Sequence, residues 1–453
     1  MTQDHSALYH NRESTRHFLY SKAEADDLPK KPMRAPAGIQ AAVQSVYPAL
    51  LTGYAFLEHS AQKLSAADFC VSAVIQIDAD DRTDFEQTKS GQTASEQTAA
   101  HQEAARLIDE LCRKHAGTWG LVDSSLYGVF LAEKTAPECL KLIQKFQETL
   151  KAQTGTTASA GVADCPERNA KPAEVLTRAL KALDHASFFG PNSAAIFDAV
   201  SLNISADKLF DKGDIKGSIA EFKQALKLDP SNTNVHNSLG VCYGLRSDYE
   251  KAKLEFKTAI KLDPTEVMAW YNLGFTKMLE GDRKQALDLF LKADAINPDV
   301  FEIAFQTGRL LVEMSRPEKG QKFLERASRL DPQSAAVFRY LGECHTSLGK
   351  IDEAIAAYKK AIKQNPSDAA SVSALGCLFD KQGENPEISM MFCQESVKLS
   401  PENGLFRYRL GQLYLKQNRL EDALKEFKKA DVLGHDAAEY IKKIQNQLPA
   451  KAL

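Results

Sequence analysis

Several features that mark nucleic-acid-binding and membrane proteins are missing from this sequence. Its 57 basic and 60 acidic side chains leave a net charge of -3, so the chain has no field that would gather a polyanion or an anionic lipid surface. No segment approaches the roughly 20 consecutive apolar residues of a membrane span. The polar segment 1–36, which we expect to be flexible, does not resemble a signal peptide. We therefore expect a soluble cytoplasmic protein that binds neither nucleic acid nor a membrane.

Motifs for catalysis and metal binding are also missing. The ten histidines are scattered, without an H-x-x-x-H pair or a cluster with cysteine. Neither a G-x-x-x-x-G-K-S/T phosphate loop nor a G-x-S-x-G nucleophile elbow occurs. The eight cysteines form no C-x-x-C pair and most lie in apolar patterns. We expect them to be reduced thiols that pack as small hydrophobic side chains.

What the second half of the chain does contain is a regular row of glycines. Five of them are spaced 34 residues apart and a sixth follows after 35. A period of 34 is typical of stacked helix-turn-helix repeats, in which each pair of helices buries its apolar face against the next pair. The glycines are Gly240, Gly274, Gly308, Gly342, Gly376 and Gly411.

Alignment on these glycines gives seven units with the same internal pattern. In the second unit Gly240 lies on a first helix, and Ala252 and Phe256 lie on a second helix. We expect the small residues to let the two helices approach while Phe256 fills the space between them. Pro264 then ends the second helix. The units start at Ala199, Thr233, Val267, Phe301, Ala335, Ala369 and Gly404.

This pattern closely resembles the tetratricopeptide repeat over residues 199–437, with segment 438–453 as a capping helix and tail. The resemblance implies an all-α superhelical solenoid whose concave groove binds a protein or peptide partner. In this family the groove is lined by the second, fifth, ninth and twelfth positions of the first helices. The matching residues are Met268, Tyr271, Phe275, Met278, Phe305, Arg309 and Arg339.

These side chains indicate the chemistry of the partner. Aromatic and methionine side chains beside arginines suit an amphipathic segment with an acidic edge. The version of the family that binds chaperone tails uses a Lys and Asn clamp, and the matching positions here are Asn203 and Asp207, which disfavours that partner class. Two alternatives stay open: the protein's own chain fills the groove, or the residues only support the superhelix.

The upstream region, residues 37–198, alternates strands with helices. Short runs rich in β-branched or small apolar residues predict strands at 71–77, 126–131 and 157–163. Helices are expected near 102–115, 136–152 and 172–187, and the polar stretch 81–102 is expected to be a mobile surface loop. This order predicts an α/β or α+β sandwich.

Several short sequence motifs in this region resemble those of the GGDEF domain of diguanylate cyclases. They include Leu51-Thr52-Gly53, Ser159-Ala160-Gly161-Val162-Ala163 and Gly190-Pro191-Asn192. The resemblance implies an α+β nucleotide-cyclase-like sandwich. It also matches Asp78 and Asp80 to the end of the strand that supplies the first metal-binding aspartate in that family.

The residues that carry the family's chemistry are nevertheless replaced. The stretch 123–127 reads DSSLY where the family has GGDEF, and Leu126 cannot ligate magnesium. We assign no catalytic residue and no cofactor, and expect the domain not to be an enzyme. The alternative is that Asp78 and Asp80 still hold Mg²⁺ and a nucleotide, which would make the domain a cyclic di-GMP or nucleotide sensor, or a residually active cyclase.

Together these patterns favour a scaffold or signalling adaptor. Its repeat groove would bind a protein partner, and its inactive GGDEF-like domain would serve as a docking module or form a homodimer. The sequence does not identify the partner or the pathway.

Overall fold

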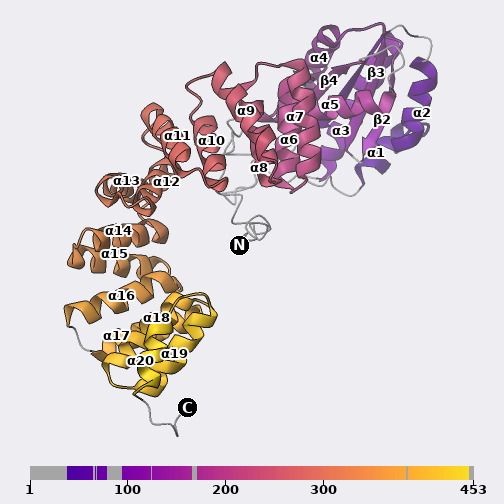
Figure 1. The fold of residues 1–453 in the computed structure, drawn as a ribbon. Coiled ribbons are helices and arrows are strands. Elements are labelled where there is room, and N and C mark those ends of the chain that lie inside the picture. Colours follow the sequence, from indigo (N-terminus) through magenta and orange to yellow (C-terminus); the bar gives the residue numbers. More distant parts are fainter. Residues whose placement is uncertain are drawn as a thin grey trace. The chain divides into compact units, whose positions relative to one another are not determined.

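A computed structural model describes residues 38–64, 67, 69–78, 94–123, 125–165, 171–383 and 386–447 (Figure 1). The chain divides into two compact units with a boundary between Pro264 and Thr265. The N-terminal unit contains an α/β domain and two helical repeats, and the C-terminal unit contains five repeats and a terminal helix. Asp80 and segment 1–36 lie outside the described residues.

The α/β domain is built on a mixed sheet of five strands in the order β2-β3-β1-β4-β5. Only the β4–β5 pair is parallel, and the other neighbouring pairs are antiparallel. The three predicted strands are confirmed as β1, β3 and β4, whereas the edge strands β2 and β5 carry no comparable sequence signal. The strands are β1 (Cys70–Ile77), β2 (Thr118–Asp123), β3 (Leu126–Ala132), β4 (Ala158–Asp164) and β5 (Ala194–Ile196).

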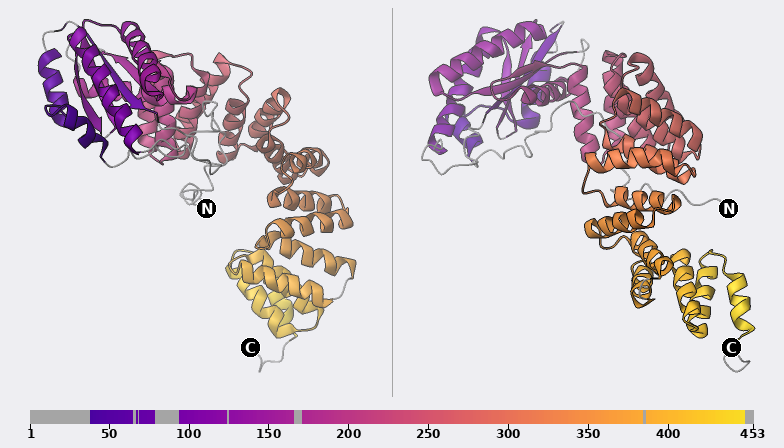
Figure 2. Two further views of the ribbon diagram at one scale, coloured as in Figure 1. Left: turned by 180° about the vertical axis from the view of Figure 1, so that it is seen from behind. Right: turned by 90° about the vertical axis from the view of Figure 1, so that its left-hand side faces the viewer.

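Helices cover both faces of this sheet (Figure 2). Because successive strand residues point to opposite faces, Ile75 packs in the core beneath α1, α3 and α4, and Val74 packs in the core beneath α2 and α5. Gly161 lets α5 approach closely, since a Cβ there would overlap the carbonyl oxygen of Ala179. The helices are α1 (Ile39–Val46), α2 (Gly53–Leu64), α3 (Ala94–Lys114), α4 (Ala136–Thr154), α5 (Pro172–Ala186) and the 3-10 helix η3 (Ser187–Phe189).

Helix α3 begins earlier than the sequence pattern suggests. It starts at Ala94, so the prediction of a loop that continues to Gln102 is wrong; residues 81–93 lie outside the described ones. Alanine has the highest helix propensity, and Ala100, Ala104 and Ile108 are buried against the sheet at helical spacing. Tertiary packing therefore extends this helix through a polar sequence.

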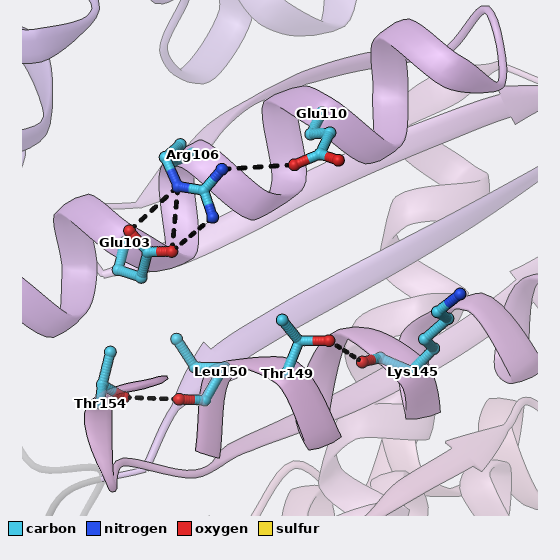
Figure 3. A network of polar contacts seen from close by, with 7 residues as sticks. All are labelled: Glu103, Arg106, Glu110, Lys145, Thr149, Leu150 and Thr154. Carbon is cyan, nitrogen blue, oxygen red and sulfur yellow. Dashed lines mark hydrogen bonds and ion pairs between the residues drawn. The ribbon is translucent and has the colours of Figure 1, made fainter. Parts of the chain in front are cut away.

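The outer surfaces of α3 and α4 carry polar contacts that stay within each helix (Figure 3). Arg106 pairs with Glu103 at 2.7 Å and with Glu110 at 3.3 Å. On α4 the hydroxyls of Thr149 and Thr154 each donate to the carbonyl oxygen four residues earlier, at 2.8 Å. Exposed contacts of this kind contribute little to stability, and they indicate a solvated surface.

A disulfide joins Cys70 and Cys165, with a Cα–Cα distance of 5.4 Å. Cys70 begins β1 and Cys165 follows β4 directly, and these strands are antiparallel neighbours with Val71 opposite Asp164. The expectation that all eight cysteines are reduced is therefore wrong for this pair. The other six are free thiols.

The repeats form pairs of antiparallel-packed helices, and every first helix begins at the residue that the glycine alignment predicts. The N-terminal unit holds α6 (Ala199–Asp211), α7 (Ile215–Leu228), α8 (Thr233–Leu245) and α9 (Tyr249–Leu262). The C-terminal unit holds α10 (Val267–Leu279), α11 (Arg283–Ile296), α12 (Phe301–Glu313), α13 (Pro317–Leu330), α14 (Ala335–Ser347), α15 (Ile351–Gln364), α16 (Ala369–Gln382), α17 (Pro386–Leu399), α18 (Gly404–Lys416) and α19 (Leu420–Val432).

Five of the six repeated glycines face large side chains of the second helices. A Cβ on Gly240 would lie 2.5 Å from the ring of Phe256, and a Cβ on Gly342 would lie 2.6 Å from the ring of Tyr358. Helix backbones in contact with rings fix the spacing within each repeat. This confirms the predicted reason for glycine at that position.

The terminal helix α20 (Ala438–Gln445) packs on α19. Its Ile444 is fully buried, and its Tyr440 stacks on Phe427 with ring centroids 4.9 Å apart. Among the described residues no helix is long and apolar enough to cross a membrane.

Within the N-terminal unit, the last helix of the α/β domain packs directly on the first repeat. Lys181 of α5 pairs with Glu221 of α7 at 2.6 Å, and Asp184 of α5 pairs with Lys208 of α6 at 2.7 Å. The Lys181 and Glu221 side chains are only 19% and 15% exposed, so solvent screens this ion pair less than a surface pair. The α/β domain thus packs against both helices of the first repeat.

Candidate partner-binding site

The predicted groove residues lie on the first helices of three consecutive repeats in the C-terminal unit. Met268, Tyr271, Phe275 and Met278 are on α10, Phe305 and Arg309 are on α12, and Arg339 is on α14. They differ in how much of their surface is exposed to solvent. Phe305, Arg309 and Arg339 are half-buried, as are Met268 and Met278.

Tyr271 is placed beneath the surface. It has no exposed area, and its ring stacks on Phe275 and Phe290 with centroid distances of 6.2 Å and 5.4 Å. Phe275 is only 6% exposed. Direct contact of Tyr271 with a partner stays a prediction, and in this structure its side chain supports the groove from beneath. A residue's position along a helix face does not reveal how deeply its side chain is buried.

The other predicted residues gather around Tyr340, which the sequence pattern does not select. The ring of Phe305 packs edge-on against Tyr340 at 5.7 Å. The guanidinium groups of Arg309 and Arg339 lie 6.0 Å and 5.0 Å from the centre of the Tyr340 ring. Arg309 also donates to the sulfur of Met278 at 3.3 Å. We call Met278, Phe305, Arg309, Arg339 and Tyr340 the Tyr340 cluster.

This cluster presents an aromatic ring in contact with two cations. Cation–π contacts orient both partners, and the Arg309 and Arg339 side chains keep 23% and 30% of their surface exposed. Burial raises the pKa of the Tyr340 hydroxyl, so this group stays protonated at neutral pH. The cluster therefore offers apolar surface and hydrogen-bond donors together.

Acidic side chains balance the two arginines. Arg309 pairs with Glu313 at 3.2 Å, and Arg339 approaches Asp368 at 3.6 Å. Burial raises the pKa of the nearby Glu343 carboxyl despite the opposing effect of Arg339. The surface is thus mixed in charge, and its arginines already have intramolecular partners that a bound acidic group would have to replace.

In the α/β domain, the carboxylate of Asp78 is fully engaged by its own chain. Its Oδ1 accepts from Ser159 Oγ, and its Oδ2 accepts from Thr157 Oγ1 and the backbone N of Asn192, all at 2.7 Å. These bonds tie the end of β1 to β4 and to the segment before β5. The geometry supports a structural role for Asp78, while Asp80 lies outside the described residues.

The hairpin formed by β2 and β3 is also tied to the core. Tyr127 at the start of β3 is fully buried, and its hydroxyl lies 2.9 Å from Nδ1 of His101 on α3. Burial lowers the pKa of His101 to about 4. The burial of this histidine could have been predicted from the sequence, because His101 shares one face of the helix with the apolar residues Ala105 and Ile108.

Comparisons with known proteins agree with the helical part of the fold. Family models described as tetratricopeptide repeat match residues 305–369 and 391–438 and residues 233–266 and 269–300, and one described as TPR repeat matches residues 206–245. The chain is 28% identical over 153 residues to Hsp70-Hsp90 organizing protein 1 of Glycine max, a match that covers 33% of this chain and 24% of that protein.

The solved structures that the chain partly resembles include YrrB, described as a TPR protein with an unusual peptide-binding site. It is 19% identical with a TM-score of 0.38, and the match covers 44% of this chain and 97% of YrrB. A tetratricopeptide repeat protein from Parabacteroides merdae is 18% identical with a TM-score of 0.41, covering 54% of this chain and 96% of its own. From about residue 200 onward, the chain is a tetratricopeptide repeat array.

Proposed function

We propose that this protein is a cytoplasmic scaffold or signalling adaptor that holds a protein partner on the concave side of its repeats, at the Tyr340 cluster. The observation that carries the proposal is the packing of half-exposed Phe305, Arg309 and Arg339 around one tyrosine ring. Clusters of aromatic and arginine side chains are enriched among residues that dominate binding energy.

The chemistry of this cluster favours an amphipathic peptide segment. An apolar side chain of the partner would pack on Phe305 and Tyr340, and an acidic or carbonyl group would accept hydrogen bonds from the guanidinium groups. Because Glu313 and Asp368 already pair with these arginines, charge alone would add little affinity. We expect binding that depends mainly on the aromatic contact.

A chaperone-tail partner is less favoured, although the relative from Glycine max is named for organizing Hsp70 and Hsp90. A terminal carboxylate needs cationic or neutral donors. At the corresponding positions of the first repeat this chain has Asn203 and Asp207, and a carboxylate at residue 207 would repel the ligand.

A matched pair of variants in the fourth repeat tests the groove. Phe305→Ala/Arg309→Ala removes one ring and one guanidinium from the first helix, α12. Phe323→Ala/Arg326→Ala removes another such pair, 5.2 Å apart, from the second helix, α13. Full-length protein immobilised as bait should lose its captured partner only with the α12 variant. Equal capture by both variants would contradict the proposed site.

We further propose that the α/β domain does not turn over nucleotide and serves as a docking or dimerising module. Leu126 occupies the place of the metal-binding acid in the GGDEF resemblance, and the Asp78 carboxylate already accepts three hydrogen bonds. Incubation of the full-length protein with GTP and Mg²⁺ should yield no cyclic dinucleotide. Formation of one would contradict this part of the proposal, and light scattering would report whether the chain dimerises.

A further inference from the structure

The sixth repeat departs from the packing pattern of the others. Where Gly240 and Gly274 face phenylalanine rings, Gly376 faces the thiol of Cys393, whose sulfur would lie 2.8 Å from a Cβ on that glycine. Cys393 on α17 thus takes the place of a large side chain. The neighbouring residue on α16 is a second cysteine, Cys377.

The two cysteines meet between the helices of the repeat. Cys393 is fully buried and Cys377 is half-buried, and they pack with Met390, Leu410 and Leu413. The two thiols lie close enough to affect each other's protonation. Both are free thiols in this structure, and Cys377 is the less buried residue of the two.

A cation lies beside this pair. Arg409 of α18 donates to the hydroxyl of Ser373 on α16 at 3.0 Å, one turn before Cys377. The hydrogen bond from Cys393 lowers the pKa of Cys377, burial opposes this shift, and Arg409 adds to it. The competing carboxylate, Asp380, pairs with Lys416. A thiolate at Cys377 is therefore favoured.

We propose that Cys377 and Cys393 form a redox-active dithiol, in which a peroxide oxidises Cys377 and Cys393 then closes a disulfide between the two helices of the sixth repeat. The Cys377 thiolate attacks one peroxide oxygen, the O–O bond breaks, and hydroxide leaves. The product is a sulfenic acid at Cys377. The sulfur of Cys393 attacks the Cys377 sulfur, the S–O bond breaks, and water forms. Two electrons pass from the dithiol to hydrogen peroxide, which becomes two molecules of water.

The α/β domain supplies an internal comparison. Cys112 and Cys139 are also a buried pair of neighbouring free thiols. Burial raises the pKa of both groups, to about 12 for Cys139. Thiolate character controls reaction with peroxides. The Cys112 and Cys139 pair should therefore remain reduced under conditions that oxidise the sixth repeat.

The test is differential alkylation and peptide mapping of full-length protein treated with hydrogen peroxide. Cys377 and Cys393 should lose alkylation together, appear in one cross-linked peptide that a reductant separates, and react at least ~10-fold faster than Cys112 and Cys139. In Cys393→Ser, a sulfenic acid at Cys377 should be trapped by dimedone, and Arg409→Gln should slow oxidation of the folded protein.

Two results would overturn the proposal. One is a wild-type protein in which no Cys377–Cys393 cross-link forms, whether Cys377 stays alkylatable or proceeds to sulfinic acid. The other is oxidation of Cys112 and Cys139 at the same rate. Neither depends on partner binding, so the outcome is independent of the proposed groove.

Discussion

The hydroxyl of Ser159 on β4 donates a hydrogen bond of 2.7 Å to Oδ1 of Asp78, the residue that directly follows β1. Thr157 and the backbone of Asn192 satisfy the other oxygen. A carboxylate with three donors from its own chain fixes the end of β1 against β4. Its first role is to stabilise the sheet.

Removing the charge of Asp78 should therefore destabilise the α/β domain. Hydrogen bonds to a charged group contribute more than neutral ones, so we expect Asp78→Asn to lower the free energy of unfolding by ~2 kcal/mol. The two tryptophans lie in different units, Trp119 on β2 and Trp270 on α10. Urea unfolding followed by Trp119 fluorescence in a Trp270→Phe background would measure the change.

The exposed Glu148 on α4 provides the control for this variant. Glu148→Gln removes one carboxylate charge from the same domain and should leave the unfolding midpoint almost unchanged. Equal midpoints for Asp78→Asn and Glu148→Gln would argue against a structural role for Asp78.

The buried His101 should make the α/β domain sensitive to mild acid. Burial lowers its pKa to about 4, whereas the unfolded chain takes up a proton near pH 6.5. The unfolded state therefore gains protons first as the pH falls. Stability should decrease from about pH 6.5 to about pH 4, by ~3 kcal/mol in total.

His101→Gln should flatten that part of the pH profile, measured by Trp119 fluorescence. His59→Gln, a change at an exposed position of α2, should leave the slope as it is. A slope that is identical in both variants would show that other groups cause the acid sensitivity.

His236 in the second repeat should respond to pH in the opposite sense. Burial disfavours its charged form, but the hydrogen bonds to Glu255, at 2.7 Å, and to the carbonyl of Pro230 outweigh burial and raise its pKa. The stabilisation is fully present below about pH 6.5 and is lost as the pH rises through the pKa of the folded state.

The variant His236→Gln should therefore cost more stability at pH 5.5 than at pH 8. Thermal unfolding of the full chain at the two pH values would measure this difference. A cost that is the same at both values would mean that the imidazole acts only through packing.

The ion pair between Lys181 and Glu221 should couple the α/β domain to the first repeat. Its nitrogen and oxygen lie 2.6 Å apart and both side chains are largely shielded, so a double-mutant cycle with Lys181→Met and Glu221→Gln should give a coupling energy of ~1 kcal/mol or more. The exposed pair of Arg106 and Glu110 on α3 is the reference, and a coupling no larger than its value would contradict the expectation.

The sequence predicts the array better than the sheet because its signals there are local and repeated. Gly240 and Phe256 must meet inside one repeat, and the same pairing recurs at fixed spacing, so the spacing alone locates each first helix. In the sheet, β2 and β5 are edge strands, and neither contains as many β-branched residues as β1.

Contacts between distant segments account for the remaining errors. The disulfide of Cys70 with Cys165 spans 95 residues and depends on the register of β1 against β4. Tyr340 lies at a position of its repeat that the family pattern does not assign to the groove, and only the stacking of α12 on α14 brings Phe305 and Arg309 to its ring. Sequence spacing cannot show such convergence.

Titration of a captured partner onto full-length protein tests the Tyr340 cluster most directly, with variants that carry either Phe305→Ala/Arg309→Ala or Phe323→Ala/Arg326→Ala. The α12 variant should bind at least ~10-fold more weakly, about 1.4 kcal/mol, while the α13 variant should bind as the wild type does. Unchanged affinity in the α12 variant, with its fold intact by circular dichroism, would contradict the assignment of the Tyr340 cluster as the partner-binding site.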